Sequence, residues 1–115
     1  RLFMSRFLHR SISKSDRRAF LEDFLLADYE AALGTIYTSV SKKAVEVMPQ
    51  KFSEISTPTL LVAGEKDRII PPEMGRQAAA LNSKIEYVEI PHTAHFPMLE
   101  DPTTYLARIR DFLGT

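Results

Sequence analysis

The sequence predicts an α/β fold in which a helical first half precedes a strand–helix–strand–helix unit. In the first half, apolar residues recur at intervals of three and four, which is the spacing of amphipathic helices. The second half holds two short runs rich in β-forming residues, at 59–63 and 85–90, with a helical pattern between them. A strand, a crossover helix and a second strand form a βαβ unit, so we expect the two strands to be parallel.

The composition is that of one globular domain without an excess of charge. Of the 115 residues, 44% are hydrophobic, and 15 basic side chains balance 15 acidic ones. This balance argues against a generic nucleic-acid-binding protein. Cysteine is absent, which excludes disulfides, thiolate metal sites and a cysteine nucleophile from these residues. We find no signal-peptide pattern and no apolar run of the roughly 20 residues that a membrane span needs, and our expectation is a cytoplasmic protein.

Several helices are expected in the first half. A short one lies near the start, where residues 1–18 carry six basic side chains and one acidic one; we interpret these as a solvated helix face rather than an anion-binding or membrane-surface segment. We expect Ser15 to cap the second helix and Asp28 the third. The third either runs to Pro49 or is followed by a separate helix after Ser41. Most of the large apolar side chains here are expected in the core, and a few could instead line an apolar pocket: Phe3, Met4, Phe7, Phe20, Phe24, Tyr29 and Tyr37.

The strands of the second half have different patterns. Residues 59–63 form a continuous apolar run that ends before Gly64, and such a run suits a strand buried on both faces of a parallel sheet. Residues 85–90 alternate between apolar and polar and end at Pro91.

The helices of the second half have clear end signals. Pro72 can open the crossover helix and Asn82 can stop it. The last helix is predicted from Asp101 as its N-cap, Pro102 at its first position and Gly114 beyond its end.

Two chemical groups follow the two strands. Asp67 lies three residues after Gly64, and His95 lies five residues after the second strand. Adjacent parallel strands would place both loops at one edge of the sheet, where open α/β sheets bind ligands. A carboxylate beside an imidazole makes the histidine a competent general base. The alternative is that Asp67 caps a turn and His95 packs locally.

These stretches resemble a known family. Residues 58–71 (PTLLVAGEKDRIIP) resemble the acid-bearing stretch of the α/β-hydrolase superfamily, and residues 91–102 (PHTAHFPMLEDP) resemble its histidine loop and last helix. The resemblance covers roughly residues 50–115, and its two motifs stand in the order that the family uses.

The resemblance implies the carboxyl-terminal part of an α/β-hydrolase fold preceded by helical cap segments. Residues 1–49 would be the cap or lid, and residues 50–115 the βαβα part of the core. The chain would belong to a hydrolase of esters, lactones, thioesters or C–C bonds next to carbonyls, with Asp67 as the acid and His95 as the base of a catalytic triad. It implies no organic cofactor and no metal.

Two other assignments of the histidines stay open at this point. A second histidine, His92, stands where the family often has a small residue, and it could compete with His95 for the assignment as the base. A metal site could combine His92 and His95 with Asp67 or Glu100. Otherwise we expect Glu100 to shape its loop without taking part in the chemistry. Ala94 stands where family members usually have glycine before the histidine, and we expect only a slight adjustment of the loop.

The family's nucleophile is not recognisable here. None of the four glycines has a serine two residues away, so the sequence holds no Gly-x-Ser-x-Gly elbow. The chain also begins with Arg1 rather than Met. We therefore expect that a nucleophile-bearing amino-terminal half is missing and that this chain alone is inactive.

The expected partners are an apolar small-molecule carbonyl substrate and either the missing half or a second copy bound through an exposed strand edge. The alternative function is a non-catalytic interaction module that keeps the hydrolase scaffold.

Overall fold

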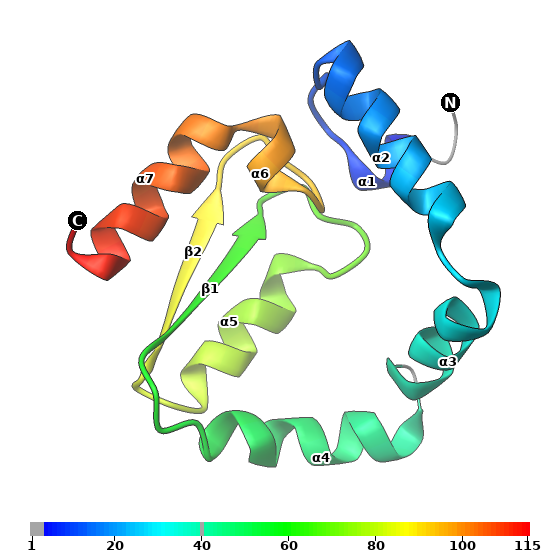
Figure 1. The fold of residues 1–115 in the computed structure, drawn as a ribbon. Coiled ribbons are helices and arrows are strands. Elements are labelled where there is room, and N and C mark those ends of the chain that lie inside the picture. Colours follow the sequence, from blue (N-terminus) through cyan, green and yellow to red (C-terminus); the bar gives the residue numbers. More distant parts are fainter. Residues whose placement is uncertain (1–3, 40) are drawn as a thin grey trace.

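The structure of the chain is a computed structural model that describes residues 4–39 and 41–115. It confirms the α/β class (Figure 1). The elements in order are α1 (Met4–Phe7), α2 (Lys14–Leu26), α3 (Tyr29–Ser39), α4 (Lys42–Ser53), β1 (Thr59–Gly64), α5 (Pro72–Ala80), β2 (Ile85–Ile90), α6 (Pro97–Glu100) and α7 (Pro102–Leu113). In this described part of the chain, no helix is both long and apolar enough to cross a membrane.

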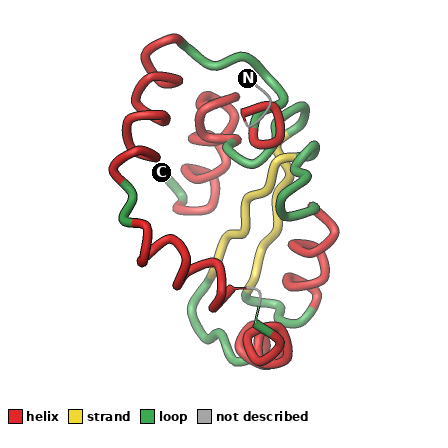
Figure 2. The backbone as a smooth tube through the Cα atoms, turned by 90° about the vertical axis from the view of Figure 1, so that its right-hand side faces the viewer, coloured by secondary structure: helices red, strands yellow, loops and turns green. Residues whose placement is uncertain are grey.

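The two strands form the predicted parallel pair. They run in register from Thr59 opposite Ile85 to Gly64 opposite Ile90. Helix α5 lies on one face of the sheet and α7 on the other (Figure 2). Because the strands are parallel, both carboxyl ends meet at one edge, and the loops that follow them leave side by side.

The expected burial of β1 on both faces is wrong for the residues that the structure describes. Only Gly64 is buried, while the other five residues of the strand are half-buried. Within this part of the chain, β2 is the single strand that pairs with β1, so the other edge of β1 has no neighbour to cover it. The core lies instead at β2 and the loop after it, where Ile85, Ile90 and Thr93 are buried.

The ends of the helices are partly as predicted. Asp28 caps α3, since its carboxylate accepts from Ala31 N–H at 2.8 Å. The cap of α2 is Ser13 rather than Ser15, because α2 begins at Lys14 and the Ser13 hydroxyl accepts from Asp16 N–H at 3.0 Å. The ends of α5 and α7 agree with their signals, and Gly114 ends α7 in the left-handed conformation with φ 70°.

Helix α4 is a separate helix that continues through Pro49 to Ser53. The predicted division between residues 49 and 50 therefore falls inside a helix. The last turn is held from outside, because the Asn82 side-chain amide donates to the carbonyls of Phe52 at 3.0 Å and Ile55 at 2.7 Å. This long-range contact binds carbonyls at the end of the helix, beyond Pro49.

The aromatic side chains of the helical half differ in how far they are buried. Tyr29 and Tyr37 are 72% and 71% exposed, so their predicted place in the core is wrong; α3 packs mainly against α4 and leaves them uncovered. Phe7 and Phe20 are half-buried and contact Phe96. The predictions for Phe3 and for the side chains of Met4 and Phe24 lie outside the described residues.

Candidate active site

Asp67 lies in a tight turn directly after β1. Its backbone N–H donates to the Gly64 carbonyl at 3.1 Å, and its side chain is 7% exposed. The carboxylate oxygen Oδ1 accepts from the N–H groups of Ile69 at 2.7 Å and Ile70 at 3.0 Å. The turn thus fixes the carboxylate and leaves Oδ2 to point toward a partner.

That partner is His95. The imidazole Nδ1 lies 2.8 Å from Asp67 Oδ2, so the structure brings together the two side chains that the sequence placed at one edge. Because a carboxylate oxygen only accepts, this contact puts a proton on Nδ1. The other ring nitrogen, Nε2, has no hydrogen-bond partner among residues 4–39 and 41–115, and the side chain is 23% exposed. The pair therefore presents an oriented imidazole with a free basic nitrogen.

The His95 ring is also held by aromatic side chains. Phe96 meets it edge-on at a centroid distance of 5.0 Å, and Phe7 of α1 does so at 5.7 Å. The His95 N–H donates to the Phe7 carbonyl at 3.0 Å. The helical half of the chain therefore reaches the candidate site through Phe7.

The two loops touch along their backbones. Glu65 N–H donates to Ile90 O at 3.1 Å, and Lys66 N–H donates to Thr93 O at 2.8 Å. This approach requires glycine at position 64, since a Cβ there would lie 1.9 Å from the Ala94 carbonyl oxygen. The requirement for Gly64 was not recognised from the sequence, where this residue only marked the end of a strand.

The other assignment of the base does not fit the geometry. The Asp67 carboxylate is bound to His95, whereas the ring of His92 lies 3.8 Å from Glu65. His92 is mostly exposed and has a positive φ of 56°, a conformation that costs a non-glycine residue energy.

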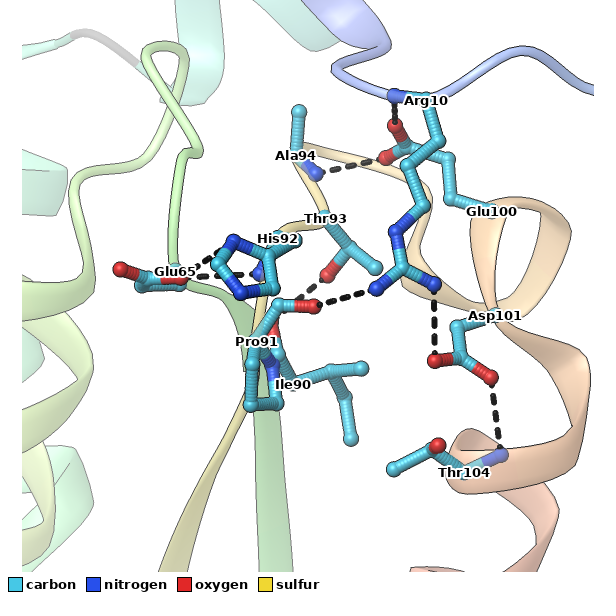
Figure 3. Close-up of polar contacts among 10 residues, drawn as sticks. All are labelled: Arg10, Glu65, Ile90, Pro91, His92, Thr93, Ala94, Glu100, Asp101 and Thr104. Carbon is cyan, nitrogen blue, oxygen red and sulfur yellow. Dashed lines mark hydrogen bonds and ion pairs between the residues drawn. The ribbon is translucent and has the colours of Figure 1, made fainter.

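The side chains proposed for a metal site do not converge either. Glu100 turns toward the backbone N–H groups of Ala94 and Arg10 rather than toward His92 (Figure 3). In the described ranges, no three histidine or acidic side chains gather closely enough to hold an ion.

The carboxylate of Glu65 is perturbed by its neighbours. The hydrogen bond from the Lys66 ammonium, followed by that from the His92 N–H, lowers the pKa of Glu65 from 4.5 to about 2. Its oxygens accept from Lys66 at 2.8 Å and from His92 N–H at 2.8 Å. The first loop thereby carries an ionised group that binds the start of the histidine loop.

An open hollow of about 370 Å³ lies beside Asp67. Its walls come from the segment around α1, including Leu8 and His9, and from the loop that holds Lys66 and Arg68. The hollow borders both loops, since Asp67 and Ala94 are among its lining residues.

A first prediction concerns the close approach at Gly64. Replacing Gly64 with Ala should destabilise the fold by about 1–3 kcal/mol, because the new methyl group collides with backbone that cannot rotate away. The matched control is Gly34→Ala in α3, where a Cβ meets nothing within 4 Å; it should stabilise the protein by about 0.5–1 kcal/mol. Urea denaturation measures both, and equal effects of the two variants would contradict the account of the loop.

A second prediction concerns Glu65. Its folded pKa lies below the ordinary value of 4.5, so its stabilising contribution is present above that pH and is lost as pH falls toward about 2. The side-chain carboxyl ¹³C shift should titrate with a midpoint near 2. Lys66→Ala should raise that midpoint, and Lys84→Ala should leave it unchanged. A wild-type midpoint near 4.5 would refute the assignment.

Comparison with known proteins agrees with this architecture. The chain matches the family model described as the α/β hydrolase fold over residues 6–102. Among solved structures, a predicted CIB-like hydrolase from Thermoplasma acidophilum has 28% identity and a TM-score of 0.56, with 60% of this chain and 33% of that chain covered. An α/β-hydrolase enzyme from a Medee basin deep-sea metagenome library has 32% identity and a TM-score of 0.55, with 64% of this chain and 27% of that chain covered.

A third structure supports the fold alone. The serine hydrolase CarC, involved in carbazole degradation, is 21% identical with a TM-score of 0.55, and 76% of this chain and 41% of that chain are covered. No curated protein matches the chain. The matched part of the chain covers less than half the length of each of these three structures. With parallel strands, a crossover helix and a family match over most of its length, this chain belongs to the α/β-hydrolase fold family.

Proposed function

We propose that this chain is the acid- and base-bearing part of an α/β-hydrolase, with His95 as the general base and Asp67 as its orienting acid. The observation that carries the proposal is the 2.8 Å contact between His95 Nδ1 and a carboxylate that its own turn immobilises. The solved relatives are described as hydrolases, which supports the reaction class.

The chemistry follows from the orientation of the ring. Nε2 would take the proton from a nucleophile's hydroxyl as that oxygen attacks the substrate carbonyl, and Asp67 would stabilise the resulting imidazolium. The same proton would then pass from Nε2 to the leaving group, and water would release the acyl group in a second round. This makes esters, lactones, thioesters and C–C bonds next to carbonyls the proposed substrates.

The nucleophile and its oxyanion hole are proposed to come from outside these 115 residues, since no Gly-x-Ser-x-Gly elbow occurs in the sequence. Among the described residues, one edge of β1 has no pairing strand, and this supports a partner here because an unpaired strand edge accepts another strand. The proposed partner is an amino-terminal half of the same hydrolase, or a second copy of the chain that pairs through this edge.

Residues 1–49 are proposed to act as a cap over the site. Phe7 of α1 contacts the His95 ring, and Phe20 of α2 contacts Phe96 at a centroid distance of 5.1 Å. Aromatic side chains beside a catalytic imidazole favour an apolar substrate, since small-molecule sites are mostly apolar.

The exposed apolar side chains of two helices favour a second function, a non-catalytic interaction module. Several apolar side chains of α2 and α3 are uncovered, among them Leu25 and Leu26, which are both 83% exposed, and Tyr29. A module of this kind would use these helices and the β1 edge to bind a protein, and it would not turn over an ester.

The test uses the full hydrolase that contains this chain, with p-nitrophenyl butyrate as the probe substrate. His95→Ala should lower kcat by about 10²–10⁴-fold, because a general base contributes that much, and should leave the unfolding temperature nearly unchanged. His92→Ala is the control and should keep near-normal turnover. A folded His95→Ala variant with normal kcat would exclude the proposed role, and a wild type that does not hydrolyse this ester would favour the interaction module.

A further inference from the structure

Glu100 is a buried acidic residue at the end of α6, next to the histidine loop but outside the proposed pair. Its exposed fraction is 7%. We propose that Glu100 is a positioning residue for His95, and that it does this by joining the histidine loop to the segment that leads from α1 to α2. This inference rests on the proposed function of His95, but the first test below, which reads the imidazole ring by NMR, does not depend on turnover.

The two oxygens of Glu100 bind two different segments. Oε2 accepts from the backbone N–H of Ala94 at 2.6 Å. Oε1 accepts from the backbone N–H groups of both His9 and Arg10. Figure 3 shows the carboxylate between Ala94 on one side and Arg10 on the other. One side chain thus bridges residues about ninety positions apart in sequence.

This bridge acts directly next to His95. Ala94 precedes His95, and the N–H of His95 itself donates to the Phe7 carbonyl at 3.0 Å. Two successive N–H groups of the loop are therefore bound, one by Glu100 and one by the segment that Glu100 also holds. Losing the carboxylate should release both attachments together. If Glu100 acted only by filling space, losing its charge would release neither of them.

Arg10 adds two further contacts between the α1–α2 segment and the region of the histidine loop. Its guanidinium Nη1 lies 2.9 Å from Asp101 Oδ2, and Nη2 donates to the Pro91 carbonyl at 3.4 Å (Figure 3). Asp101 is also the N-cap of α7, and the N–H of Thr104 is the main reason that the pKa of Asp101 is lowered. The histidine loop is therefore bound at its start through Arg10 and beside its histidine through Glu100.

We expect that an uncharged residue of the same size does not replace Glu100. All three contacts use the side chain as an acceptor. A glutamine keeps one acceptor oxygen, and its NH₂ group would face the N–H donors of the other segment. Glu100→Gln should thus keep the volume but lose one of the two attachments.

The test reads the imidazole of His95 by long-range ¹H–¹⁵N correlation at neutral pH. In the wild type, the ring nitrogens should show the proton held on Nδ1 by Asp67. In Glu100→Gln they should shift toward the average of two tautomers, because the ring no longer keeps its contact with Asp67. The matched control is Glu86→Gln, since Glu86 is exposed on β2, and it should leave the ring signals unchanged.

The outcomes separate this inference from the proposed function. A folded Glu100→Gln variant with wild-type ring signals would overturn the positioning role. If that variant does not fold, the ring signals of His95 are measured in Glu100→Asp, which keeps the charge but is too short to bind both segments. A shift of these signals supports the positioning role, and wild-type signals overturn it. If the ring signals shift in Glu100→Gln while His95→Ala leaves turnover of the full hydrolase intact, the proposed function fails and the positioning role stands.

A kinetic readout in the full hydrolase completes the test. Glu100→Gln should lower kcat by about 10–100-fold with little change in KM, as expected for a displaced catalytic group that does not itself bind the substrate. A rise in KM at constant kcat would instead assign Glu100 to substrate binding and would contradict the inference.

Discussion

The in-register parallel pairing of β1 with β2 is the constraint on which the candidate site depends. Because Gly64 lies opposite Ile90, both strands end at one edge and their loops leave side by side. The missing side chain at Gly64 lets the Ala94 carbonyl approach the end of β1, and this approach places the His95 ring against Asp67. A one-residue slip of β2 would turn its side chains to opposite faces and separate the loops.

The parts predicted from the sequence are those with local signals. The strands and α7 follow from runs of β-forming residues and from caps such as Asp101, whose carboxylate accepts from Thr104 N–H at 3.1 Å. The meeting of Asp67 and His95 followed from the parallel arrangement and from the family resemblance. Long-range contacts could not be predicted in this way. The last turn of α4 depends on Asn82, and the exposure of Tyr29 depends on what packs against α3.

Glu100 illustrates the same limit within the site. Its place in the sequence indicated only a residue that shapes a loop, because nothing local shows that His9 and Arg10 come to its carboxylate. The short helix α6 that presents it was also not predicted, although Pro97 at its start is a typical first helical residue. In the folded chain, the helical half contacts the core through Phe7 and through the Glu100 carboxylate. The position of α1 and the orientation of His95 are therefore coupled.

The central claim is that Asp67 and His95 form one interacting pair, and a double-mutant cycle tests it most directly. Unfolding free energies are measured by urea denaturation for the wild type, Asp67→Asn, His95→Gln and the double variant. The account predicts a coupling energy of about 1–3 kcal/mol, as found for residues in direct hydrogen-bonded contact. Strictly additive effects would show that the carboxylate and the imidazole do not interact in the folded protein, and they would contradict the account.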